Sequence, residues 1–185
     1  MKDPKQMLQW LKGRPQRTSK ARQLYGSCVA AARDLIFYRD WHVADSLDGR
    51  FEMVMLHAGL LVRRLSADGE AGNALGQAVL EEMVAALDDD LRELGVSDLR
   101  VPKKVQAAAS AFYGRLRAYD AALTAADMAA LEVALQRNVP AGEIGPIDAQ
   151  PMAAYVSLCA ETLRTQSLDA MEAGAVTFPA PRTAA

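Results

Sequence analysis

The sequence predicts an all-α protein, folded as a single compact domain of six or seven helices around a central buried helix. Apolar residues recur at steps of three and four along several long stretches, which is the period of one helix face. Alanine dominates the apolar set, which makes up 51% of the chain, and runs of β-branched residues are missing. With 185 residues, the chain is long enough to build one hydrophobic core.

The first predicted helix spans about residues 18–33, and a short aromatic segment at 37–41 follows it. The predicted centre of the fold is the next helix, about 46–65, with Asp45 or Ser46 as its N-cap. Apolar residues cover nearly all sides of that helix, and such a helix is buried on nearly all sides. We therefore expect the other helices to pack around it.

Four further helices are expected after the central one. They span about residues 72–94, 105–123, 127–137 and 151–173. The second of these has apolar residues at alternating steps of four and three, which is typical of a narrow helix-packing seam. The organised domain is thus expected at 18–173. A disordered tail is expected at 174–185, because a glycine opens it and two prolines follow.

Charge is distributed unevenly along the chain. Residues 1–22 carry seven bases and one acid, a net charge of +6, so the remainder carries −8 of the total of −2. We interpret residues 1–17 as a basic, mobile arm, whose bases and Trp10 suit an anionic membrane surface or ribosomal RNA. A solubilising terminus or a mitochondrial targeting segment would look similar. The acidic body argues against a specific DNA partner.

The residues that usually carry chemistry do not form a recognisable site. Histidine is limited to His42 and His57, and neither has a glutamate three residues earlier, as a di-iron bundle requires. Cys28 and Cys159 lie within predicted helices, where buried thiols are expected. The run Asp88-Asp89-Asp90 lacks the spacing of a calcium loop, which leaves a solvated acidic face. We therefore expect no catalytic residue, no metal and no cofactor.

Arg50, His57 and Arg64 recur at seven-residue intervals and form one stripe along the central helix. In one interpretation, the arginines pair with internal acids and His57 satisfies a buried carbonyl. In the other, the stripe borders a groove that receives a partner. We expect Arg50, at the buried start of the helix, to belong to an internal network and Arg64, near its end, to line the groove.

The aromatic residues Tyr25, Phe37, Tyr38 and Trp41 also allow two interpretations. They could all pack in the core, which is the usual place for large aromatic side chains. An exposed subset would instead form a cluster of strong contacts for a protein partner.

Two groups of segments carry a resemblance to a known family. The first comprises Leu24-Tyr25-Gly26, Ala32-Arg33, Phe37-Tyr38, Asp48-Gly49-Arg50-Phe51-Glu52-Met53, Leu56-His57 and Arg63-Arg64-Leu65. The second comprises Phe112-Tyr113-Gly114-Arg115-Leu116 and Tyr119-Asp120. Over roughly residues 20–140, these segments resemble the ubiquinol–cytochrome c chaperone family. The chain departs from the family at Asp34-Leu35-Ile36 and Val43-Ala44-Asp45-Ser46, where prolines are usual.

The resemblance implies an assembly factor and not an enzyme. Mitochondrial relatives bind newly made cytochrome b, together with a small partner protein and near the ribosomal exit, before it enters the cytochrome bc1 complex. We therefore expect a chaperone for cytochrome b or a similar apolar membrane-protein client. Its place would be the cytoplasmic face of the inner membrane in a bacterium, or the matrix side in a mitochondrion.

The residues expected to contact a partner come from the arm, the aromatic set and the stripe. They are Trp10, Tyr25, Phe37, Tyr38, Arg50, His57 and Arg64. The alternative is a small-ligand-binding protein or an enzyme with an apolar pocket beside His57, because a few polar groups in apolar surroundings are also typical of such pockets.

Overall fold

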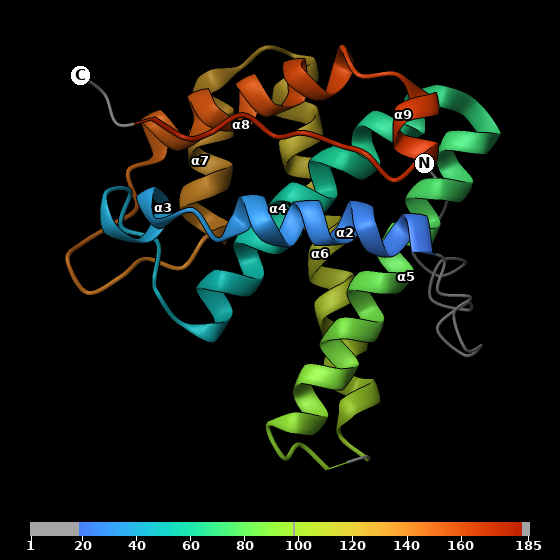
Figure 1. Cartoon of the computed structure of the whole chain (residues 1–185). Coiled ribbons are helices and arrows are strands. Elements are labelled where there is room, and N and C mark those ends of the chain that lie inside the picture. The colour runs from blue at the N-terminus through green and yellow to red at the C-terminus, as the bar shows by residue number, and fades with distance from the viewer. Residues whose placement is uncertain (1–18, 98, 183–185) are drawn as a thin grey trace.

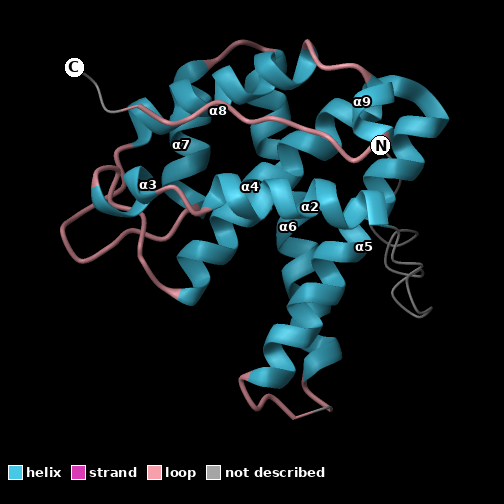
Figure 2. Ribbon diagram, in the orientation of Figure 1, coloured by secondary structure: helices cyan, strands magenta, loops and turns pink. Residues whose placement is uncertain are grey.

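Helices make up nearly all of the regular structure in the computed structural model, which describes residues 19–97 and 99–182 (Figure 2). In chain order they are α2 (Ser19–Ala32), α3 (Leu35–Arg39), α4 (Leu47–Leu65), the 3-10 turn η2 (Ser66–Asp68), α5 (Gly69–Glu93), α6 (Val101–Thr124), α7 (Met128–Asn138), α8 (Ala149–Arg164) and α9 (Leu168–Glu172). An isolated antiparallel bridge joins Val43 to Ala141. The prediction of an all-α fold is confirmed. Trp10 and the arm predicted at 1–17 lie outside the described residues.

The central helix is α4. It packs against α2, α5, α6 and α8, and residues 55–61 are buried without interruption. A helix buried over two consecutive turns must be enclosed on every side, as its sequence predicts. Its first turn differs, because Leu47 and Arg50 are exposed. Ser46 caps this turn by accepting a hydrogen bond from the Gly49 backbone N–H at 3.1 Å.

The sharp turn from α4 into α5 depends on two glycines. Gly69 has a φ of +67°, which L side chains rarely adopt. At Gly72, a Cβ atom would overlap the backbone carbonyl oxygen of Leu65, the last residue of α4. The absence of a side chain at Gly72 therefore lets the start of α5 lie directly against the end of α4.

Helices α5 and α6 form a long antiparallel hairpin that projects from the rest of the molecule (Figure 1). The apolar residues predicted to form a packing seam on α6 are mostly buried: Val105, Ala109, Phe112, Leu116 and Tyr119. The connection between the two helices lies at the far end of the hairpin, where Leu94 is 61% and Leu99 94% exposed. No helix among the described residues has the length and apolar character needed to cross a membrane.

The helix predicted at 151–173 is two helices. α8 ends at Arg164 and α9 begins at Leu168. Between them, the Ser167 hydroxyl accepts a hydrogen bond from the Ala170 backbone N–H at 3.3 Å and caps α9. A serine in this position favours a new helix start, because its side chain satisfies a backbone donor that the preceding turn leaves unpaired.

The C-terminal segment also differs from the expected disordered tail. Residues 174–182 follow an extended course against the body of the protein (red in Figure 1). Val176 and Phe178 pack against the core, and Pro181 is buried. Glycine and proline explain why the segment forms no helix, whereas its apolar side chains explain why it docks.

Candidate functional site

His57 lies in the middle of α4 and is completely buried. Its Nδ1 is 2.7 Å from the Met53 carbonyl oxygen and its Nε2 is 2.8 Å from the Tyr155 hydroxyl. Because a carbonyl only accepts, Nδ1–H donates to Met53 and Nε2 accepts from Tyr155. Burial lowers the pKa of His57 to about 4, so the ring is neutral at physiological pH. The interpretation that His57 satisfies a buried carbonyl is confirmed.

Aromatic rings enclose the imidazole. The ring centroids of Phe37, Tyr155 and Phe178 lie 5.8, 5.8 and 5.1 Å from that of His57. Trp41 extends the cluster by packing on Phe37 at 5.4 Å and on Tyr155 at 5.8 Å. This packing leaves His57 no solvent-facing surface, so the geometry does not favour a ligand pocket beside it.

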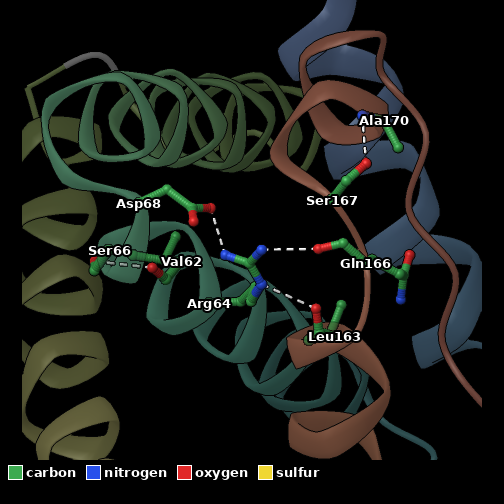
Figure 3. Close-up of polar contacts among 8 residues, drawn as sticks. All are labelled: Val62, Arg64, Ser66, Asp68, Leu163, Gln166, Ser167 and Ala170. Carbon is green, nitrogen blue, oxygen red and sulfur yellow. Dashed lines mark hydrogen bonds and ion pairs between the residues drawn. The ribbon is translucent and has the colours of Figure 1, made fainter.

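Arg64 connects three parts of the chain (Figure 3). Its Nε donates to the Leu163 carbonyl at 3.0 Å, its Nη2 donates to the Gln166 carbonyl at 2.7 Å, and its Nη1 pairs with Asp68. The side chain is only 13% exposed. Arg64 therefore holds the end of α8 against the end of α4, and the expectation that it faces a groove is corrected.

Arg50 has the opposite environment. Its side chain is 53% exposed, and its Nε donates to the equally exposed Asp45 carboxylate at 2.6 Å. The guanidinium carbon lies 5.4 Å from the centre of the Tyr38 ring, in cation–π geometry. The expectation that Arg50 belongs to a buried network is corrected. The first turn of α4 is exposed to solvent at Leu47 and Arg50, and the helix is enclosed only in its later turns.

The predicted aromatic residues divide into two classes. Phe37 and Trp41 are buried in the His57 cluster, whereas Tyr25 and Tyr38 remain partly exposed. The Tyr38 hydroxyl donates to the Ala32 carbonyl at 2.6 Å, which ties α3 to the end of α2. Of these four residues, Tyr25 and Tyr38 are thus the ones that offer surface to a partner.

A shallow groove between α4 and α6 contains two ion pairs that were not among the predicted site residues. Glu52 and Arg115 form one ion pair in its lining, with 2.6 Å between Oε1 and Nη1. Arg63 and Asp120 form the second, with 2.7 Å between Nε and Oδ1. The apolar side chains that line the groove are those of Met55, Leu56, Leu60, Phe112, Leu116 and Leu123. The enclosed volume is about 10 Å³, about the room that one water needs.

Gly59 sets the separation of the two helices in this groove. A Cβ atom there would lie 3.3 Å from Leu116 Cδ1 and 3.6 Å from Phe112 Cε2. These distances are at or just inside van der Waals contact. The close approach of α6 at Gly59 explains why the groove is narrow and does not accommodate a small organic ligand.

The carboxyl group of Glu52 belongs to one of the few buried charged residues of the described chain. Burial raises the pKa of Glu52 to about 7, although the charge of Arg115 acts in the opposite direction. Burial and the nearby Glu52 charge together raise the pKa of Tyr119, which also lines the groove. Glu52 therefore changes charge near neutral pH.

A sequence signal for this groove existed. Glu52 and Arg63 are eleven residues apart, which places them on one face of α4, and Arg115 and Asp120 offer opposite charges on the next long apolar helix. The first two residues lie in the first group of resemblance segments and the other two lie in the second group. The two groups therefore meet in space through complementary charges.

The described residues form a helical scaffold in which titratable side chains join one helix to another. No group of three histidine, cysteine, aspartate or glutamate side chains in this part of the chain is arranged to hold a metal ion.

Comparison with known proteins identifies the family of this scaffold. A family model described as ubiquinol–cytochrome C chaperone matches residues 39–178. The crystal structure of the Cbp3 homolog from Brucella abortus is similar, with a TM-score of 0.78 and 38% identity over 88% of this chain and 90% of that chain. A search of curated protein sequences found no match. The chain belongs to the ubiquinol–cytochrome c chaperone family.

Proposed function

We propose that this protein is a non-enzymatic assembly chaperone. It binds newly made cytochrome b, or a similar apolar membrane-protein client, and supports the biogenesis of the cytochrome bc1 complex. The observation that carries this proposal is the family match together with 38% identity to the Cbp3 homolog across 88% of the chain. The described polar clusters support it, because His57, Arg64 and Glu52 join helices and none of them faces a pocket of substrate size.

The surface around Tyr38 and Arg50 is the proposed contact with the client. Both side chains are accessible, and the exposed Leu35 and Leu47 belong to the same two elements, α3 and the first turn of α4. Tyr25 adds a partly exposed ring on α2. Aromatic and arginine side chains beside apolar residues are typical of strong protein–protein contacts. By contrast, Phe37 and His57 are buried and Arg64 nearly so, so these three side chains would affect binding at this surface only by maintaining the fold.

The arm at residues 1–17, with Trp10, is the proposed contact with an anionic membrane surface or with the ribosome. A small partner protein is a further proposed component. Within a bacterium, the protein would act in the cytoplasm at the periphery of the inner membrane, and within a mitochondrion on the matrix side of that membrane. These positions correspond to where a membrane-protein client emerges from its ribosome.

The test is capture of the client from membranes. A tagged copy, expressed in the source organism, is purified after mild solubilisation, and bound proteins are identified by mass spectrometry. We expect cytochrome b, and we expect Arg50→Ala to reduce its recovery. Arg164→Ala is the matched control, because Arg164 also forms an exposed ion pair, with Glu161 at 2.6 Å on α8. Absence of cytochrome b and of other membrane-protein clients from the wild-type purification would contradict the proposal.

A further inference from the structure

Residues 174–182 form a C-terminal strap whose attachment resembles a bound peptide. The chain turns at Gly174, which has a φ of +87°, and then runs back along α8 in the opposite direction (Figure 1). Among the described residues, Ala175 is the last in the strap whose backbone bonds to another backbone group, at 2.9 Å to Ala170. Beyond Ala175, side chains of the body hold the strap.

One amide side chain binds the strap backbone. Gln166 Nε2 donates to the Thr177 carbonyl at 2.8 Å, and the Thr177 backbone N–H donates to Gln166 Oε1, also at 2.8 Å. The amide thus occupies both the donor and the acceptor of one residue, as a neighbouring β-strand would. These bonds do not depend on the identity of the side chain at the bound residue.

The next residue supplies the apolar contact. The Phe178 ring packs edge-on against the buried His57 ring, with centroids 5.1 Å apart and planes inclined by 79°. Phe178 thereby contacts the same His57 ring that Phe37 and Tyr155 also contact. Pro181 is buried further along. Backbone bonds at one residue and an apolar pocket for the next are the two elements by which proteins bind extended peptides.

We propose that the surface beneath the strap is an acceptor site for extended apolar segments of a client polypeptide, and that the strap occupies this site when no client is bound. The inference rests on the proposed chaperone function. A newly made membrane protein presents backbone groups without partners and many large apolar side chains, which are the two features that Gln166 and the pocket over His57 recognise. The occupying segment has a glycine and two prolines and forms no helix, so it loses little internal structure when displaced.

The test measures binding of a strap peptide in trans. The probe is a fluorescein-labelled peptide with the sequence of residues 175–182, added to a chain that ends at Ala173. Because the tethered strap competes at a high effective concentration, we expect about tenfold or more tighter binding to the shortened chain than to the full chain. A peptide with leucine in place of Phe178 should bind similarly, whereas one with aspartate there should not.

Two further variants make the result specific. In the shortened chain, Gln166→Ala should weaken peptide binding about tenfold, whereas Gln136→Ala, at an exposed position of α7, should not change it. If the shortened chain does not fold, as judged by circular dichroism, Phe178→Ala in the full chain replaces it and should also gain peptide binding. A folded shortened chain, or a Phe178→Ala chain, that binds no peptide would overturn the inference.

Failure of the acceptor site and failure of the proposed function give different results. Peptide binding without recovery of cytochrome b or another membrane-protein client from membranes would leave the acceptor site in place and contradict the proposed function. Recovery of cytochrome b in equal amounts by the full and shortened chains, without peptide binding, would support the chaperone function and overturn the role of the strap.

Discussion

Two arginines of the same helix, fourteen residues apart, differ in what they do. Arg64 donates to two backbone carbonyls and an acid in a nearly closed setting, whereas Arg50 pairs with one acid in solvent. Sequence spacing predicts that both lie on one face of α4, which is correct for a helix. Spacing does not predict which part of that face other helices will bury. Arg64 is largely buried by the end of α8 and the turn after it, where Leu163 and Gln166 lie about a hundred positions further along the chain.

Replacing these two arginines should have unequal effects on stability. We expect Arg64→Ala to lower the free energy of unfolding by ~3 kcal/mol, because it leaves the partly buried Asp68 without its ion pair and removes the hydrogen bonds to two backbone carbonyls. Arg50→Ala should change it by less than about 1 kcal/mol, as exposed ion pairs usually do. Urea unfolding of both variants measures the difference. Similar values for the two would contradict the assignment of Arg64 as a connector of α4 and α8.

Glu52 and His57 give the pH dependence of stability two opposing contributions. The pKa of Glu52 is raised to about 7. The stabilisation that Glu52 contributes is therefore fully present below about pH 4.5 and is lost as the pH rises through 7. The pKa of His57 is lowered to about 4. The stabilisation that His57 contributes is therefore fully present above about pH 6.5 and is lost as the pH falls towards 4. Between pH 4.5 and 6.5 the free energy of unfolding falls with pH through Glu52 and rises with pH through His57, so the two changes largely cancel.

Glu52→Gln should therefore steepen the acid side of the stability profile. With only the His57 contribution left, the free energy of unfolding should fall by up to ~3 kcal/mol between pH 6.5 and 4. Urea unfolding at half-unit pH intervals, for the wild type and the variant, measures both profiles. Parallel profiles would show that the two buried groups do not titrate as their surroundings indicate.

At the scale of the element, spacing predicts α4, α5, α6 and α7 to within a few residues, because each has a continuous apolar face and a clear end. The helix predicted at 151–173 is different. Its apolar pattern continues through the break after Arg164, but the carbonyls of Leu163 and Gln166 bond to Arg64. Ser167 was the local signal for a new helix start, and the distant Arg64 contact reinforces it.

Two helix glycines should respond to alanine in opposite directions. Gly114 lies inside α6, where a Cβ atom would meet open space, so Gly114→Ala should stabilise the protein by up to about 1 kcal/mol. Gly72→Ala should destabilise it by ~2 kcal/mol or more, because its Cβ meets the Leu65 carbonyl and the backbone must move. Thermal melts of the two variants test this. If Gly114→Ala destabilises the protein, the space around Gly114 is not open as the structure describes it.

At the scale of the whole molecule, α4 organises both proposed surfaces. Its first turn carries Arg50 towards solvent beside Tyr38, and its middle presents His57 to the strap through Phe178. The sequence allowed the all-helical fold and the family to be predicted from periodicity and motifs. The strap was predicted to be disordered because its glycine and prolines indicate that it forms no helix, but they do not indicate whether it packs against the body. Its docking depends on Gln166 and His57, whose positions follow from the tertiary fold.

The basic arm is expected to act separately from this body. The core of the described residues begins with Ala21 and Leu24 of α2, and α2 itself packs against α4 and α5. A chain without residues 1–17 should therefore keep its helical circular dichroism and its melting temperature. The same deletion removes five bases and Trp10. Each base near an anionic surface contributes up to about 1 kcal/mol, so affinity for that surface should fall steeply.

Co-sedimentation with vesicles that contain phosphatidylserine, and pelleting with ribosomes, measure this loss at low and at physiological salt. Binding of the full chain should weaken as salt rises, because the contact is electrostatic. A variant in which the five bases are replaced by glutamine while Trp10 is kept separates charge from the aromatic contact: we expect it to bind nearly as poorly as the deletion. If the deletion leaves both vesicle and ribosome binding unchanged, the arm does not have the proposed role, and the surface around Tyr38 and Arg50 becomes the next candidate for that contact.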